Sequence, residues 1–185
     1  KALFLTVTLL YPVLFGILAV LPIFIEVMGK QKFQPTMHLI YIFTFASFWA
    51  IPSTTFTNVL NAIGKIKITL ILMVMWTFLT WILAPLFAIY FDYTGVAVAY
   101  LIISFTSIIP IVLVSKMLNI DVVATVLKPF VSAGLMASVL FLISLFLPRN
   151  LLVLISLIVL GCLIYSMSMY LIAKNKIIET LRSFR

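Results

Sequence analysis

Long apolar runs with very few charged residues constrain this chain more than any other feature. Residues 66–91 read IKITLILMVMWTFLTWILAPLFAIYF and contain one charged side chain, that of Lys67. A bilayer-spanning helix needs about 20 mostly apolar residues, and a soluble domain usually carries about 25% charged residues. Here 65% of the 185 residues are hydrophobic and 9% are charged. The sequence therefore predicts an all-α integral membrane protein, because a membrane β-barrel would alternate apolar and polar residues.

Six apolar runs separated by turn signals divide the chain. Gly29 and Pro35 flank the first loop, and the turn FDYTG separates the third and fourth runs. We expect a bundle of six transmembrane helices over residues 2–28, 36–62, 66–91, 94–117, 126–147 and 151–173. Residues 174–185 follow as a basic tail whose apolar residues share one helical face, which predicts a cytoplasmic amphipathic helix at the membrane surface.

The basic residues are distributed unequally between the two sides that six spans would create. One side holds nine Lys or Arg: Lys1, Lys65, Lys67, Lys116, Lys128, Lys174, Lys176, Arg182 and Arg185. The other side holds three: Lys30, Lys32 and Arg149. Short loops rich in Lys and Arg remain in the cytoplasm, so both ends of this segment are expected there. The net charge of +8 is accounted for by topology and anionic membrane lipids, and no nucleic-acid partner is expected.

A polar face runs along the second predicted span, which ends in PSTTFTNVLNAIGKIK. Its members recur at helical spacing and are Thr44, Ser47, Thr54, Asn58 and Asn61. Thr57 lies at the border of this face. In a bilayer such a face must point at protein or at water. Two interpretations stay open. The hydroxyls and amides either bridge neighbouring helices or line a hydrated path for a polar substrate.

The chain offers few other chemical groups. Glu26 lies near the outer end of the first span, where it could couple transport to a cation or proton or simply reach the membrane surface. No catalytic motif, metal-binding cluster or phosphate-binding glycine loop is present, and Cys162 is the sole cysteine. We therefore expect no enzyme activity, no cofactor and no metal site.

Four stretches in order carry a resemblance to a known family. They read FGILAVLPIFIEVMGKQKF, VLNAIGKIKITLIL, YTGVAVAYLI and LKPFVSAGLMA. Together they resemble the polysaccharide biosynthesis proteins, the O-antigen and lipid-linked oligosaccharide flippases of the multidrug/oligosaccharidyl-lipid/polysaccharide exporter superfamily. The likeness is to the C-terminal portion of a protein of about 14 spans, so about eight spans are expected ahead of Lys1.

The resemblance implies a two-lobed transporter that works by alternating access in the cytoplasmic membrane of a prokaryote. Its cargo would be a polyprenyl-pyrophosphate-linked oligosaccharide destined for cell-surface polysaccharide. The chain departs from the family in having no basic residue in the interior of a span to hold the pyrophosphate, because Lys67, Lys116 and Lys128 lie at the ends of their expected spans. The alternatives are a cation-coupled drug exporter or peptidoglycan-precursor flippase of the same superfamily, and a non-transporting membrane scaffold subunit.

Overall fold

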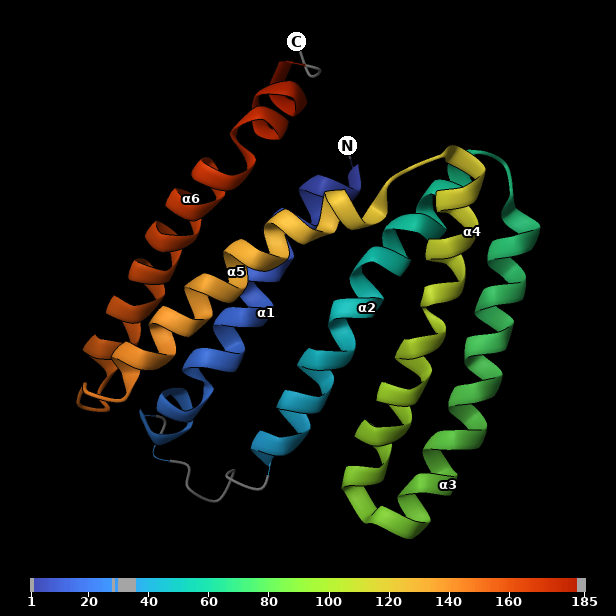
Figure 1. Cartoon of the computed structure of the whole chain (residues 1–185). Helices are drawn as coiled ribbons and strands as arrows, with labels where there is room; N and C mark the ends of the chain where they lie inside the picture. The colour runs from blue at the N-terminus through green and yellow to red at the C-terminus, as the bar shows by residue number, and fades with distance from the viewer. Residues whose placement is uncertain (1, 28, 30–35, 183–185) are drawn as a thin grey trace. The chain divides into compact units, whose positions relative to one another are not determined.

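Every regular element that the structure describes is an α-helix (Figure 1). The computed structural model describes residues 2–27, 29 and 36–182, with the backbone alone for 174–182. The helices are α1 (Ala2–Val27), α2 (Thr36–Ala62), α3 (Ile66–Thr106), α4 (Ile108–Leu118), α5 (Val122–Ser144) and α6 (Leu151–Arg182). Five helical stretches in this part of the chain are long and apolar enough to cross a membrane: Ala2–Val27, Thr36–Ala62, Ile66–Leu118, Val122–Ser144 and Leu151–Ala173. The all-α prediction is confirmed for the described residues.

The third of these stretches is folded back on itself. It has 53 residues, which as one straight helix would extend about 80 Å, far beyond the roughly 30 Å of a bilayer core. Its backbone leaves the helical region at Asp92, with φ 54° and ψ −143°. The indole Nε1 of Trp76 donates a hydrogen bond to Thr106 Oγ1 at 2.9 Å, although these residues are 30 positions apart. Only an antiparallel pair of arms permits that bond, and Figure 1 shows the reversal.

A second interruption separates α3 from α4 at Ser107, where the sequence suggested one helix over 94–117. Pro110 causes this break, because proline has no N–H and its ring crowds the carbonyl of the residue four positions earlier. The Ser107 N–H bonds instead to the carbonyl of Ser104 at 3.0 Å. The helix resumes at Ile108.

The last two helices also differ from their expected bounds. Helix α5 begins at Val122, before the expected position 126, and ends at Ser144 rather than 147. The side chain of Asn150 caps α6 by accepting a bond from the Val153 N–H at 2.9 Å. Helix α6 continues through Arg182, into the expected tail. The side chains of 174–185 lie outside the described residues, so the amphipathic face predicted there stays a prediction.

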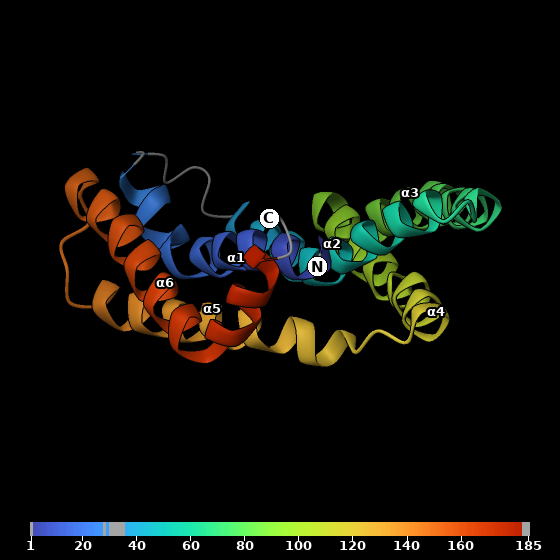
Figure 2. The same ribbon diagram turned by 90° about the horizontal axis from the view of Figure 1, so that it is seen from above.

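The chain forms two compact units, which we describe separately. Unit 1 comprises residues 1–37 and 123–185, and unit 2 comprises residues 38–122. In unit 1, α1, α5 and α6 lie against one another (Figures 1 and 2). The Phe130 ring of α5 makes edge contacts with the rings of Tyr11 and Phe15 of α1, at centroid distances of 6.0 and 5.1 Å. In unit 2, α2 contacts the second arm of α3 through Phe43 with Tyr100 and Trp49 with Phe105.

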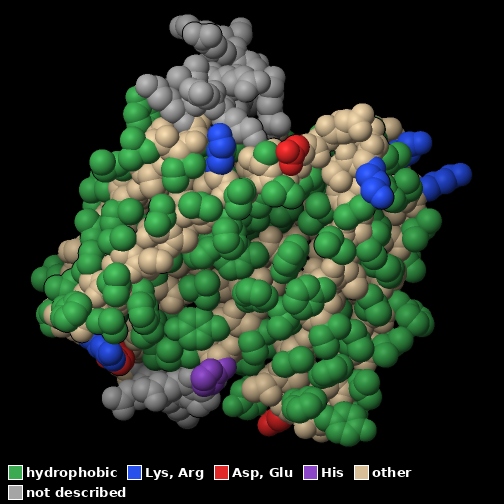
Figure 3. Space-filling view, viewed as in Figure 1, with side chains coloured by type: hydrophobic (Ala, Val, Ile, Leu, Met, Phe, Trp, Pro, Cys, Tyr) green, Lys and Arg blue, Asp and Glu red, His purple; other side chains and the backbone are tan. Residues whose placement is uncertain are grey.

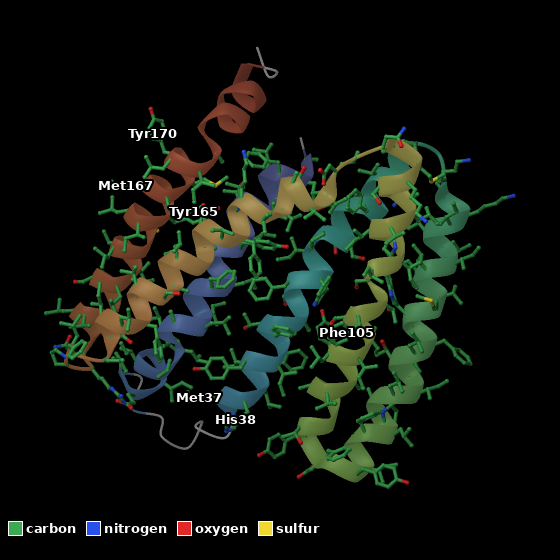
Figure 4. All side chains as sticks on the ribbon, in the orientation of Figure 1. Met37, His38, Phe105, Tyr165, Met167 and Tyr170 are labelled. Carbon is green, nitrogen blue, oxygen red and sulfur yellow. The ribbon has the colours of Figure 1, made fainter. Side chains whose placement is uncertain are left out.

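A proline in α1 explains one polar contact inside unit 1. Pro12 has no N–H to bond the carbonyl of Thr8, four residues earlier. The hydroxyl of Tyr165, from α6, donates to this carbonyl at 2.8 Å. Figure 4 shows Met167 and Tyr170 of the same helix pointing away from the unit. Tyr165 therefore supplies the donor that α1 lacks, and this bond joins the first and last helices of the unit.

Replacing Tyr165 by phenylalanine is expected to lower the free energy of unfolding by about 1 to 2 kcal/mol, because it leaves a buried carbonyl without a donor. The cost should shrink in a Pro12→Ala background, where residue 12 regains its own N–H. Thermal unfolding in detergent measures both effects, with Tyr90→Phe as the control because that side chain is 74% exposed. An equal cost in the two backgrounds would contradict this account of the bond.

Candidate functional site: the polar face of helix α2

The structure divides the predicted polar face of α2 between packed and exposed positions. Thr44 and Thr57 are buried, with 5% and 3% of their surface exposed. Ser47 is half-buried, and Thr54, Asn58 and Asn61 are exposed. The polar face is therefore open mainly over the second half of the helix.

The exposed residues of this half lie opposite its packed side. Phe56 and Leu60 are 1% and 0% exposed, and at 100° per residue they project away from Asn58. The packed side also holds Ser53 and Thr55, at 3% and 8% exposure. The sequence analysis did not single out these two residues, because their positions lie outside the helical spacing of the polar face. Neither the residue type nor the spacing indicated that they are buried.

Three hydroxyl groups of the polar face, those of Ser47, Thr54 and Thr57, are satisfied within α2 itself. Ser47 Oγ donates to the Phe43 carbonyl at 2.8 Å, and Thr54 Oγ1 donates to that of Ala50 at 2.9 Å. Thr57 Oγ1 bonds the Thr54 carbonyl at 2.9 Å. Bonds of this kind hide the polar hydrogen, so these three residues tolerate an apolar environment.

The two amides differ from the hydroxyls. Among the described residues, the side chains of Asn58 and Asn61 find no hydrogen-bond partner, and both are exposed. They are three residues apart on a helix, so they are neighbours on its surface. Moving such an amide from water into hydrocarbon without a partner costs about 4–8 kcal/mol. This pair therefore requires water, lipid headgroups or a polar ligand.

The amide pair lies next to the basic end of unit 2. Helix α2 ends in a left-handed Gly64 (φ 76°), with Lys65 N–H bonded to the Leu60 carbonyl at 2.8 Å and Gly64 N–H to that of Asn61 at 3.1 Å. Lys67 is the second residue of α3, and Lys116 lies in the last turn of α4. Because the arms of α3 are antiparallel, these lysines share one end of the unit, where Figure 3 shows basic side chains gathered.

Glu26 is paired with a residue that the sequence analysis did not connect to it. Its carboxylate accepts a hydrogen bond from the guanidinium of Arg149, which lies between α5 and α6. The side chains are 35% and 51% exposed, and ion pairs of this kind contribute about 0–1 kcal/mol. The two residues are separated by 123 positions, so no local pattern could have indicated the pair. The pairing ties the end of α1 to the α5–α6 connection.

The described residues contain no cluster of three His, Cys, Asp or Glu side chains that could hold a metal ion. Cys162 is exposed and unpaired as a free thiol. The described chemistry of the site is thus limited to hydroxyls, amides and the nearby lysines.

Over the residues that the structure describes, these observations define an all-helical chain with five helical stretches long and apolar enough to span a membrane. Comparison of the chain with protein-family models, curated proteins and solved structures found no match.

Proposed function

We propose that this chain is part of a transporter that moves a polyprenyl-pyrophosphate-linked oligosaccharide across the cytoplasmic membrane of a prokaryote by alternating access. The observation that carries the proposal is the exposed amide pair, Asn58 and Asn61, on a helix whose opposite side is packed. The family resemblance of the sequence supplies the substrate class. The proposal makes the open half of the α2 polar face part of the substrate path.

The chemistry of the face suits such a substrate. A sugar-pyrophosphate head cannot enter hydrocarbon without polar partners, whereas its polyprenyl tail can stay in the bilayer. Amides both donate and accept hydrogen bonds, as sugar hydroxyls do. Lys65, Lys67 and Lys116 would favour an anionic head at the adjacent end of unit 2. They provide cations close to the path, at the ends of the helices rather than in their middle.

The same proposal includes a topology of six crossings. Each arm of the folded Ile66–Leu118 stretch would cross once, which leaves both ends of the segment on the cytoplasmic side. In unit 2 the lysines at one end support this arrangement, because the opposite end carries His38 and Asp92. Basic loops of this kind remain in the cytoplasm.

A scaffold without transport activity is the second candidate, and the hydroxyl bonding favours it. Thr44 and Thr57 are buried, and the hydroxyl of Thr57 is satisfied within α2. A face that packs against a partner helix would use such groups as structural contacts. A cation-coupled drug exporter has less support, because the carboxylate that would serve it, Glu26, is engaged by Arg149.

Cysteines placed along α2 distinguish transporter from scaffold. After Cys162 is replaced by alanine, cysteines at Thr54, Asn58 and Asn61 are expected to react with a membrane-impermeant thiol reagent, because a substrate path holds water. A cysteine at the exposed apolar position Phe45 is the control and should react at least about tenfold more slowly, because a thiol facing lipid stays protonated. Uniformly unreactive positions on intact protein would contradict the path.

The choice of competitor then tests the substrate. A lipid-linked sugar pyrophosphate should protect the cysteine at position 58 from labelling, whereas a lipophilic drug cation should not. Protection by the cation alone would favour the drug exporter.

A further inference from the structure

The reversal within α3 carries a group of exposed aromatic side chains. Tyr90, Phe91 and Tyr93 surround Asp92 in the sequence and are 74%, 58% and 54% exposed. In the described part of the chain neither tyrosine hydroxyl has a hydrogen-bond partner, and the exposed Asp92 carboxylate forms no ion pair. We call the three aromatic residues the aromatic tip of unit 2. Apolar rings that end in free hydroxyls suit a boundary between an apolar layer and water.

Each arm of the reversal carries a lysine and a tyrosine at the same separation. In the arm before Asp92, Lys67 and Tyr90 are 23 positions apart. In the arm after it, Tyr93 and Lys116 are also 23 positions apart. A helix of that length extends about 35 Å, whereas the hydrocarbon core of a bilayer is about 30 Å thick. Either arm can therefore place its lysine in one headgroup layer and its tyrosine in the other.

The bond between the two arms shows that their lysines lie at one level. The indole of Trp76 donates to Thr106 at 2.9 Å. Trp76 is nine positions after Lys67, and Thr106 is ten positions before Lys116. Both lysines are thus about 14–15 Å from this bond along the arms. The aromatic tip lies at the opposite end, where Figure 1 shows the chain turning back.

The stretch between the basic end and the aromatic tip is compatible with lipid. Neither arm has a charged residue between its lysine and its tyrosine. Halfway along the first arm, Phe78 and Trp81 are 68% and 77% exposed. The exposed hydroxyls of Thr77 and Thr80 donate to carbonyls of their own helix, at 2.9 and 2.8 Å, which hides their polar hydrogens. The polar groups without partners are therefore confined to the two ends of the arm.

We propose that the aromatic tip is an anchor in the membrane interface, in the leaflet opposite the lysines. The rings of Tyr90 and Tyr93 lie at the boundary of the acyl chains, and their hydroxyls lie among the phospholipid headgroups, a depth at which tyrosine is enriched in membrane proteins. At this depth the Asp92 carboxylate reaches water, whereas a charged group in hydrocarbon would be costly. The anchor rests on the crossing of each arm that the proposed function includes, and it requires no particular substrate.

Spin labels measure the depth of the tip while both tyrosines are in place. With Cys162 replaced by alanine, a label on Ile89→Cys, a position that is 80% exposed, should lie just inside the headgroup layer. A label on Phe78→Cys should lie near the bilayer centre. Relaxation by oxygen, which concentrates in hydrocarbon, and by a water-soluble nickel chelate gives both depths. A label at position 89 that is as deep as the one at 78, or fully in water, would overturn the proposal. Shielding from both reagents would overturn it too, because protein rather than lipid would then cover the tip.

A change of bilayer thickness distinguishes an anchor from a residue that merely happens to lie at this depth. In lipids with hydrocarbon cores of about 27 to 33 Å, the label at Ile89 should keep a constant distance from the headgroups, because the arms change their tilt. In the variant that combines Tyr90→Ala and Tyr93→Ala, only the lysines hold the arms. The label should then sink by about 3–6 Å in the thickest bilayer. Equal behaviour with and without the tyrosines would overturn the proposal.

The matched control is Phe78→Ala, which removes an exposed ring from the middle of the arm and should leave the depth at position 89 unchanged. Tyr90→Trp with Tyr93→Trp should retain the anchor, because tryptophan is also enriched at the interface. If the alanine variant fails to insert, the depth measured with both tyrosines present still decides. A label at position 78 far from the bilayer centre would refute the crossing and the anchor together. A central label there with a misplaced label at 89 would refute the anchor alone.

Discussion

Tryptophan at both Thr54 and Asn58 is expected to abolish transport while the protein continues to fold and insert. Both side chains are exposed on the open half of the α2 polar face, so a larger group has room without disturbing the packed side. The indole rings would occupy the substrate path and remove one of the two amides. We expect transport to fall at least about tenfold, which corresponds to about 1.4 kcal/mol at the limiting step. The measurement is flipping of a fluorescent lipid-linked oligosaccharide in proteoliposomes.

The control for this prediction is Phe45→Trp, which adds a similar ring at an exposed apolar position of the same helix. It should transport at the unsubstituted rate. Asn58→Gln is informative as well, because it keeps the amide and should retain most activity. Normal transport by the double tryptophan variant, with normal protein levels, would remove α2 from the substrate path.

The largest effect on stability is expected for Gly95→Ala. Gly95 is buried just after the reversal at Asp92, and a Cβ there would overlap the backbone carbonyl group of Phe87 and approach Ala88 N to 2.8 Å. Backbone atoms cannot yield as a flexible side chain can, so the arms of α3 would have to separate. We expect the free energy of unfolding to fall by at least about 3 kcal/mol.

Gly134→Ala is the matched control, since its Cβ would meet only the Phe15 ring at 3.9 Å, an ordinary contact. It should be close to neutral, or slightly stabilising because alanine is the better helix former. Thermal unfolding of the two variants measures this difference. Indole fluorescence reports in addition whether the hydrogen bond from Trp76 to Thr106 is lost. Equal stability of both variants would show that the reversal is looser than this geometry requires.

Local sequence signals predicted the helices well where the chain itself carries the cause. The apolar runs predicted the bounds of α1 and α2 to within one residue. A run of twenty or more apolar residues in a membrane forms a helix, because only a helix satisfies the backbone hydrogen bonds within the segment. Gly64 follows the end of α2 with a positive φ of 76°. Glycine adopts this left-handed conformation without a steric penalty, which is why it commonly terminates helices. The reversal near FDYTG was predicted, whereas the break at Ser107 was not, because Pro110 acts on a carbonyl four residues before it.

The candidate site was only partly predictable. Helical spacing identified Thr54, Asn58 and Asn61 as one face, and these residues are exposed. The same spacing assigned Thr44 and Thr57 to that face, but the fold buries both of them. Spacing fixes direction around a helix axis, whereas burial depends on which neighbours occupy that direction.

The sequence by itself determined that the chain is helical, apolar enough for a membrane, and polar along one side of its second helix, since these follow from composition and periodicity. Tertiary structure alone decided which of those polar groups stay open, that Arg149 meets Glu26, and that Tyr165 serves the carbonyl freed by Pro12. Each of these pairings joins residues more than a hundred positions apart or depends on a neighbouring helix. Propensity and spacing act over a few residues, so contacts of that range exist only once the helices have packed.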